Sequence, residues 1–278
     1  MPKKGHNTRF LFYFLKNLNL NNFAEGSSHP LLTQSLLNSI DIQITDDVSE
    51  QKSIASILSS LDDKIDLLHR QNKTLEALAE TLFRQWFVEK AEWATGTIED
   101  EFDFTMGQSP PGSSYNENGN GMVFFQGRTD FGFRFPEHRV YTTEPKRLAK
   151  KFDTLISVRA PVGDMNMAME ECCLGRGVAA FRYRNNTSYH TYTYYKLRSL
   201  MAQIKQFEDS GTVFGAISKG DFKKLENEIP PEDLIKKYQA QANPLDKKIY
   251  QNTVQIKTLT GLRDTLLAKL MSGEVRVT

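Results

Sequence analysis

Hydrophobic residues recur at alternating intervals of four and three positions through residues 50–87. The run extends from Ile54 to Trp86, and Asn72 is its single polar member. Such spacing forms a heptad seam, which is typical of a long helix that lies along another helix. A continuous helix over this stretch would extend about 57 Å at 1.5 Å per residue, too long for the core of a small domain. The pattern therefore predicts a coiled-coil helix whose buried asparagine fixes the register.

A weaker copy of this seam lies 184 residues further along the chain. The expected seam residues are Leu61, Ile65, Leu68, Asn72, Leu75 and Leu82 in the first helix and Leu245, Ile249, Ile256, Leu259 and Leu266 in the second. Proline removes a helical hydrogen bond, so we expect the second helix to kink or begin at Pro244. We expect it to end near Met271, because Gly273 is a typical helix stop.

The repeat continues upstream of both helices. Residues 26–44 align with residues 211–229 at a shift of 185, which places Thr33 opposite Ser218 and Ile40 opposite Leu225. Before these blocks, RFLFYFLKNL resembles YTYYKLRSLM. Any two heptad helices look alike, but that does not explain non-helical blocks that match in the same order. We interpret the chain as containing an internal duplication.

Between the two copies the pattern changes to short apolar runs separated by glycine, proline and asparagine. MVFFQG, FGFRF, RVYTT, TLISVRAP and GVAAFRYR are rich in β-branched and aromatic residues, which is typical of strands. Residues 144–152, EPKRLAKKF, could form a short basic helix, and YYKLRSLMAQIKQF a longer closing one. The sequence therefore predicts an α+β fold, with a mainly β domain over residues 96–230 between two long helices.

The distribution of charge is more informative than the net charge of +1. Residues 122–200 hold thirteen lysines and arginines against seven acidic residues, whereas residues 46–95 hold six against ten. A basic region attracts phosphate, although an ordinary mixed surface would give the same counts. The cysteines, Cys172 and Cys173, are adjacent and poorly suited to a disulfide, which favours a reducing cytoplasm. No apolar run is long enough to cross a bilayer, and the basic N-terminus lacks a signal-peptide cleavage site.

Motifs for catalysis are missing from the sequence. It contains no G-x-x-x-x-G-K-[ST] loop, no Asn-Pro-Pro-aromatic methyltransferase motif and no Gly-rich cofactor fingerprint. Cys172, Cys173 and His138 do not have the spacing of a tetrahedral zinc site. We therefore expect a chain that is not an enzyme and that holds no metal or cofactor of its own.

Side chains in the loops of the middle segment have the chemistry of DNA readers. Arginine, lysine, glutamine and asparagine read base edges, and hydroxyl groups hold phosphates. The candidates are Gln108, Ser109, Ser113, Tyr115, Gln126, Arg128, Arg134, Lys146, Arg159 and Arg176. Two alternatives stay open: Arg159 could form a structural ion pair with Asp164, and Arg176, between two glycines, could mark a tight turn.

Taken together, these features resemble the specificity subunit of type I restriction–modification systems. The resemblance is carried by EQKSIASILSSLDDKIDLLHRQNKTLEALAETLFRQWF, GQSPPGSSYNENGNG, FFQGRTDFG, LISVRAPVGDMNMA and CCLGRGVAAFR. It implies two long antiparallel helices that separate two target recognition domains, each reading half of a split DNA target. It assigns residues 1–45 to the tail of a truncated recognition domain, 46–95 and 231–278 to the conserved helices, and 96–230 to a complete recognition domain.

The resemblance also implies partners. These are double-stranded DNA, modification subunits that methylate adenine with S-adenosylmethionine, and restriction subunits; ATP and Mg would likewise be held by the partner subunits. Because only one recognition domain is complete, a homodimer through the long helices would supply the second. The alternative is a coiled-coil protein-interaction module that does not bind DNA sequence-specifically.

Overall fold

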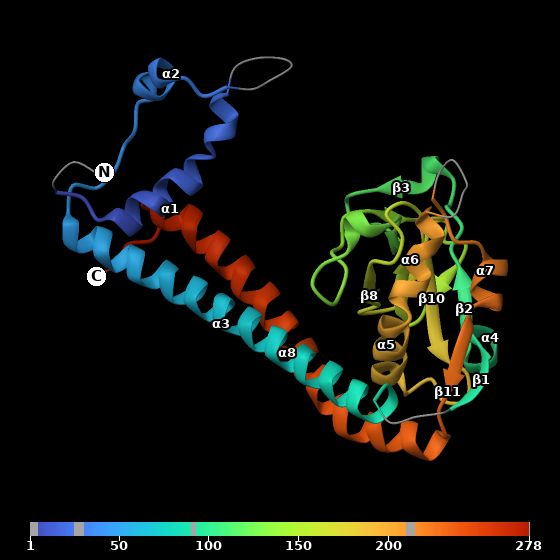
Figure 1. The fold of residues 1–278 in the computed structure, drawn as a ribbon. Coiled ribbons are helices and arrows are strands. Elements are labelled where there is room, and N and C mark those ends of the chain that lie inside the picture. Colours follow the sequence, from blue (N-terminus) through green and yellow to red (C-terminus); the bar gives the residue numbers. More distant parts are fainter. Residues whose placement is uncertain (1–4, 25–30, 90–92, 210–214, 278) are drawn as a thin grey trace. The chain divides into compact units, whose positions relative to one another are not determined.

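The computed structural model describes residues 5–24, 31–89, 93–209 and 215–277. The chain forms two compact units. A helical unit combines Met1–Leu75 with Lys247–Thr278, and a β-domain unit comprises Glu76–Asp246. The two long helices, α3 (Val48–Phe87) and α8 (Glu232–Met271), each contribute a part to both units (Figure 1).

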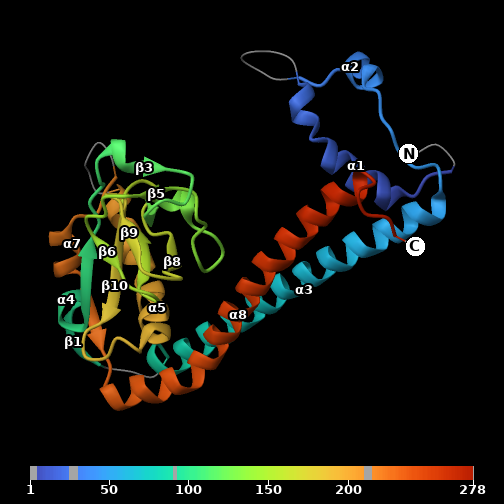
Figure 2. The same cartoon turned by 180° about the vertical axis from the view of Figure 1, so that it is seen from behind.

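The helical unit pairs the first part of α3 with the last part of α8 in antiparallel fashion (Figure 2). Arg263 Nη1 donates to Asp62 Oδ1 at 2.8 Å, and Asn252 Nδ2 donates to Asn72 Oδ1 at 2.9 Å. Partners therefore advance along α3 as they retreat along α8. Three further elements complete the unit: α1 (Thr8–Leu18), the 3-10 helix η1 (Leu20–Phe23) and α2 (Gln34–Ser39). One cluster joins α1 to both long helices through Phe10, Tyr13, Phe14, Ile54, Ala55, Leu58, Leu267 and Leu270.

The expected seam residues differ in burial. Ile65, Leu68, Asn72 and Ile249 are buried. Leu61, Leu75, Leu82, Leu245, Ile256, Leu259 and Leu266 are partly buried. The seam asparagine has a partner of its own kind in Asn252, so the polar position is a hydrogen-bonded pair.

The internal repeat has a structural counterpart. Both long helices have 40 residues, and both their first and their last residues lie 184 positions apart. Upstream, Thr33 and Ser218 each cap a short helix, α2 and α7 (Lys219–Lys224), by accepting a hydrogen bond of 3.2 Å from the backbone three residues on. The aligned positions 26–30 and 211–214 lie outside the described residues. Matching caps and matching helix bounds support a duplication.

Of the two alternatives for Pro244, a fresh start of the second helix there is wrong. The helix begins at Glu232, and Pro244 lies exposed inside it. Ile235, Tyr238 and Ala242 extend the seam on the N-terminal side of the proline, and all three are fully buried. Burying a large apolar side chain contributes about 1.5–3 kcal/mol, so these contacts offset the roughly 3 kcal/mol cost of proline in a helix. The predicted end was right: the helix stops at Met271, and Gly273 has a φ of 75°.

The β-domain unit contains two main sheets. The first has the order β2-β10-β7-β8 and the second the order β3-β5-β4-β9-β6, and β1 pairs with β11 in a separate two-stranded sheet. All these pairs are antiparallel except β4–β9. The bounds are β1 (Ala94–Thr97), β2 (Phe102–Met106), β3 (Tyr115–Asn116), β4 (Met122–Phe125), β5 (Tyr141–Thr142), β6 (Leu148–Ala149), β7 (Thr154–Ser157), β8 (Met165–Met167), β9 (Cys172–Leu174), β10 (Val178–Tyr183) and β11 (Glu226–Ile229).

Helices complete this unit. Short ones are α4 (Ile98–Glu101), η2 (Gly112–Ser114) and η3 (Arg128–Asp130), and α5 (His190–Ser199) packs against β7 and β10. An apolar core of Val123, Phe125, Ala149, Leu155, Ala168, Cys172, Leu174, Val178 and Ala180 joins strands of both main sheets. The α+β expectation, with a mainly β domain and long antiparallel helices, is confirmed.

Three local predictions within the β-domain unit were wrong. Residues 144–152 form no helix, because Leu148 and Ala149 pair with β9 as strand β6. FGFRF forms no strand, because Gly132 exchanges its backbone hydrogen bonds with the side chain of Asn166. The closing helix is interrupted at Leu200, between α5 and α6 (Met201–Asp209).

Candidate nucleic-acid interface

Three glycine-bearing segments meet at one edge of the β-domain unit. They follow β2, β4 and β9, and backbone hydrogen bonds join Gln108 N to Leu174 O at 2.9 Å and Gly175 N to Phe125 O at 2.8 Å. A Cβ atom on Gly107 would lie 2.1 Å from the Gly175 carbonyl oxygen, and one on Gly177 would lie 2.4 Å from the Gln126 carbonyl oxygen. Glycine is therefore required here by close backbone approach within the chain.

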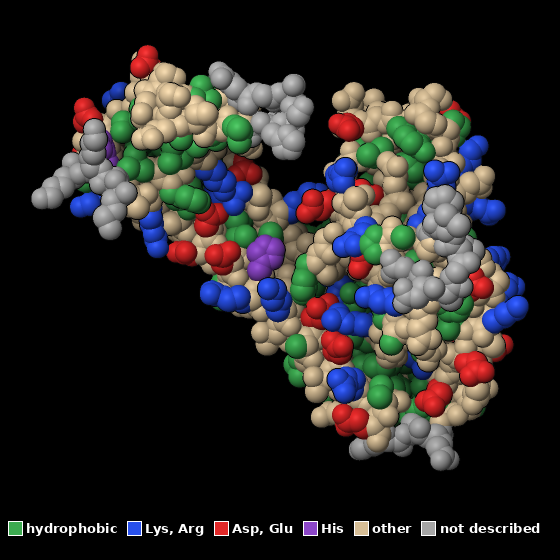
Figure 3. All heavy atoms as spheres, turned by 45° about the horizontal axis from the view of Figure 1, so that its top comes forward, with side chains coloured by type: hydrophobic (Ala, Val, Ile, Leu, Met, Phe, Trp, Pro, Cys, Tyr) green, Lys and Arg blue, Asp and Glu red, His purple; other side chains and the backbone are tan. Residues whose placement is uncertain are grey.

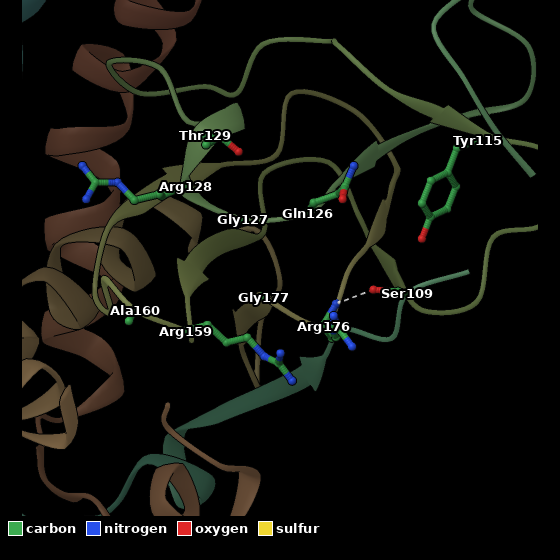
Figure 4. Close-up of a pocket in the computed structure, with 10 residues that line it drawn as sticks. All are labelled: Ser109, Tyr115, Gln126, Gly127, Arg128, Thr129, Arg159, Ala160, Arg176 and Gly177. Atoms are coloured by element: carbon green, nitrogen blue, oxygen red, sulfur yellow. Dashed lines mark hydrogen bonds between the residues drawn. The ribbon is translucent and has the colours of Figure 1, made fainter. Parts of the chain in front are cut away.

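A pocket of about 630 Å³ opens where these segments converge (Figure 4). Its lining residues are Ser109, Tyr115, Gln126, Gly127, Arg128, Thr129, Arg159, Ala160, Arg176 and Gly177. Six of the sequence candidates come together in it: Ser109, Tyr115, Gln126, Arg128, Arg159 and Arg176. Sequence reasoning missed Thr129 and Ala160 as lining residues, although each directly follows a candidate arginine.

Arginine dominates the electrostatics of this pocket. No acidic residue lines it, and Arg159 and Arg176 are exposed, with no carboxylate at ion-pair distance among the residues that the structure describes. Figure 4 shows both guanidinium groups directed toward a common region, whereas that of Arg128 points away. Elsewhere on the β-domain unit, the face seen in Figure 3 mixes basic and acidic side chains. On that face, basic side chains stand beside acidic ones, whereas the residues that line the pocket include arginines and no acidic residue.

The two alternatives left open by the sequence have different outcomes. Asp164 pairs with Arg128, whose Nε lies 2.8 Å from Asp164 Oδ2, so the ion pair considered for Arg159 does not form. Arg176 does lie in a turn, because Val178 N donates to Gly175 O at 3.0 Å. Its own backbone N–H donates to Ser109 Oγ at 3.3 Å, while its side chain is exposed.

The remaining polar groups of the pocket are held in place by local contacts. Tyr115 donates its hydroxyl proton to Pro110 O at 2.9 Å, and its ring packs on Phe124 with centroids 4.9 Å apart. The hydroxyl oxygen can still accept a hydrogen bond. Gln126 N donates to Asp130 Oδ2 at 2.8 Å, and the Gln126 side chain is exposed. The pocket thus presents guanidinium and amide donors on a fixed backbone.

Four sequence candidates do not line the pocket. Gln108, Ser113 and Lys146 are exposed, and Ser113 belongs to η2. Arg134 was wrongly predicted as a DNA contact, because its side chain is only 1% exposed and lies 3.3 Å from both Glu76 Oε1 and Asp246 Oδ1. These two carboxylates, which are remote from Arg134 in the sequence, balance the charge of its guanidinium group inside the protein.

Other functional chemistry is scarce in the described part of the chain. No group of three or more His, Cys, Asp or Glu side chains there is arranged to hold a metal ion. Cys172 and Cys173 are free and buried, and burial raises the pKa of the Cys172 thiol. None of the helices in the described ranges has the length and apolar character that crossing a membrane requires.

Comparisons with known proteins agree on one family. The family model described as the type I restriction modification DNA specificity domain matches residues 1–77 and 90–254. The putative type I restriction enzyme MjaX specificity subunit of Methanocaldococcus jannaschii is 29% identical over 290 residues, covering 96% of this chain and 68% of that protein. The MjaIX specificity subunit of the same organism is 25% identical, covering 100% of this chain and 71% of its own length.

A solved structure supports the fold. The S subunit of a type I restriction–modification system from M. genitalium superposes with a TM-score of 0.63 at 21% identity, covering 96% of this chain and 73% of that one. With most of the sequence matched by the family model, the chain belongs to the family of type I restriction–modification DNA specificity domains.

Proposed function

We propose that the arginine pocket is the DNA-reading surface of a type I restriction–modification specificity subunit. The observation that carries this proposal is the convergence of exposed Arg159, Arg176 and Gln126 from separate loops, with no acidic residue in the pocket lining. Arginine binds O6 and N7 of guanine with two hydrogen bonds, and glutamine binds N6 and N7 of adenine in the same way. Ser109 and Tyr115 add hydroxyl groups of the kind that contact phosphates.

Residues 96–230 would then act as one target recognition domain. The exposed Gln108, Ser113 and Lys146 are suited to phosphate contacts, which orient the duplex without reading its sequence. Lysine is a point charge on a flexible stem, so we assign Lys146 to affinity rather than to base selection.

The long helices would serve as scaffold and docking surface for the modification and restriction subunits. In this proposal the chain performs no catalysis itself, and S-adenosylmethionine, ATP and Mg belong to those partners. Because α3 already buries its seam against α8 of the same chain, a homodimer would have to use the outer faces of these helices. We expect the complex to act in the cytoplasm, where DNA is accessible and buried thiols such as Cys172 remain reduced.

The test is selection of bound duplexes from a random pool by the full chain together with its modification subunits. Arg176→Ala and Arg159→Ala should each relax one base position, with a loss of about 1–3 kcal/mol on the preferred sequence. Lys146→Ala should weaken all sequences alike and lower the salt slope by about one. Arg184→Ala is a matched control, because Arg184 is exposed, pairs with Asp103 and does not line the pocket.

Two results would count against this proposal. The first is that the complex enriches no sequence, which would instead favour a protein-interaction module. The second is that both pocket variants retain the sequence preference and affinity of the unaltered chain.

A further inference from the structure

Arg134 lies at the centre of a buried charge cluster in the β-domain unit. It is contributed by the loop after η3, and its side chain is 1% exposed. Its Nη2 lies 3.3 Å from Glu76 Oε1 on α3 and 3.3 Å from Asp246 Oδ1 on α8. The same nitrogen donates to the Tyr195 hydroxyl at 2.6 Å, and the guanidinium carbon lies 3.7 Å from the ring centroid of Tyr194. One side chain thus joins a loop to three helices.

This cluster is held by charge more than by ideal hydrogen bonds. Both carboxylate oxygens of Asp246, and Nε and Nη1 of Arg134, are buried without a hydrogen-bond partner among the described residues. Glu76 also pairs with Arg198 at 2.9 Å, and Arg198 pairs with Glu80 at 3.2 Å. Without Arg134, the Asp246 carboxylate would be buried with no counter-charge.

The loop that carries Arg134 also carries part of the pocket. Residues 126–134 include Gln126 and Arg128. Strand β8 and its flank hold this loop from one side: Met167 N donates to Arg134 O at 2.8 Å, Asn166 bonds both backbone groups of Gly132 at 3.0 Å, and Asp164 pairs with Arg128. The contacts of Arg134 with the helices hold it from the other side.

We propose that Arg134 is a positioning residue, which fixes residues 126–134 against α3, α5 and α8 and thereby sets the placement of Gln126 and Arg128 in the pocket. The consequence for sequence selection rests on the proposed DNA-reading function, whereas the fixing of the loop does not. Arginine suits this role because Nη2 reaches two carboxylates and a phenol while the planar guanidinium group stacks on the Tyr194 ring. Lysine offers the charge without the planar group.

The role predicts a local effect that a loss of stability alone would not produce. In Arg134→Met, amide hydrogens of residues 126–134 should exchange about tenfold faster or more, relative to those of β7 and β10. Arg134→Lys should show a smaller increase at the same amides, and it remains informative if the methionine variant does not fold. Arg182→Met is the matched control, since it removes the Arg182–Asp153 ion pair on the same unit and leaves the loop contacts intact.

Selection from a random duplex pool, with modification subunits present, supplies the second measurement. Arg134→Lys or Arg134→Met should broaden the preference at the base positions that Gln126→Ala relaxes, while positions relaxed by Arg176→Ala stay selective. Arg182→Met should change neither pattern. The proposal is overturned if exchange in the Arg134 variants rises evenly over the unit as in the control. If the unaltered complex selects no sequence, the DNA-reading function fails, and the exchange measurement still decides whether Arg134 fixes the loop.

Discussion

The Asn72–Asn252 pair is the sharpest test of how α3 and α8 recognise each other. Asn72 is 2% exposed and Asn252 is 0% exposed, and the two amides are joined at 2.9 Å. Replacing Asn72 by leucine removes the acceptor and leaves the Asn252 amide buried with only a 3.5 Å contact to Gln71 Oε1. A buried polar group that loses its partner costs about 1–3 kcal/mol. We expect each single leucine variant to lower the free energy of unfolding by that amount.

The double variant should behave differently. Replacing both partners by apolar residues leaves no orphaned amide, so its free energy of unfolding should lie within about 1 kcal/mol of the unaltered chain. The double-mutant cycle should therefore give a coupling free energy of at least about 1 kcal/mol. The double variant lacks the buried polar pair that fixes the register of the two helices. We therefore also expect heterogeneous or self-associating species in sedimentation experiments.

Urea titration of the full chain, followed by far-ultraviolet circular dichroism, measures these free energies. Lys73→Leu on the exposed face of α3 is the control and should change stability by no more than about 0.5 kcal/mol. Additive costs, with a double variant as unstable as the sum of the two singles, would refute the view that the asparagines act as a pair.

Three further predictions concern other parts of the chain. Gly107→Ala should lower the thermal midpoint by several degrees, at about 2–4 °C per kcal/mol, because its Cβ would lie 2.1 Å from a backbone oxygen; Gly112→Ala, with nothing within 4 Å, should leave it unchanged. Pro244→Ala should raise the free energy of unfolding by about 1–3 kcal/mol in urea titrations, because it restores a helical hydrogen bond at an exposed position. Burial raises the pKa of Glu101, so the folded chain binds this proton more tightly than the unfolded chain. Stability should therefore fall as the pH rises from the ordinary glutamate range through the raised pKa, and Glu101→Gln should flatten that slope in a pH series.

The long helices were predictable because the spacing of apolar residues along each helix indicates how that helix packs. A heptad seam specifies a helix whatever its partner, and it located the end of α8 at Met271. The alternative of a helix start at Pro244 was wrong because the proline was given more weight than the heptad pattern. Ile235, Tyr238 and Ala242 continue the three- and four-residue spacing up to Pro244, and that signal was present in the sequence.

The pocket was predictable in its chemistry and less so in its geometry. Arg159 and Arg176 are arginines in predicted loops, and arginine is a residue type that binds nucleic acid. Residue type and loop position were therefore enough to identify them as candidates. The role of Arg134 depends on Glu76 and Asp246, which lie far away in sequence, and nothing local indicates that it is buried. The pairing of Asp164 with Arg128, and not with Arg159, was also unpredictable from the sequence. Only the fold decides which of the two arginines lies within reach of this carboxylate.

The crossing of backbones at Gly107, Gly175 and Gly177 separates two tasks that loops usually combine. Main-chain contacts set the path of these loops, so the exposed side chains at positions 108, 126 and 176 contribute little to holding it. The side chains at those positions can therefore be replaced together while the three glycines are kept. Under the proposed function, new target sequences should be reachable by altering side chains alone, without rebuilding the loops that carry them.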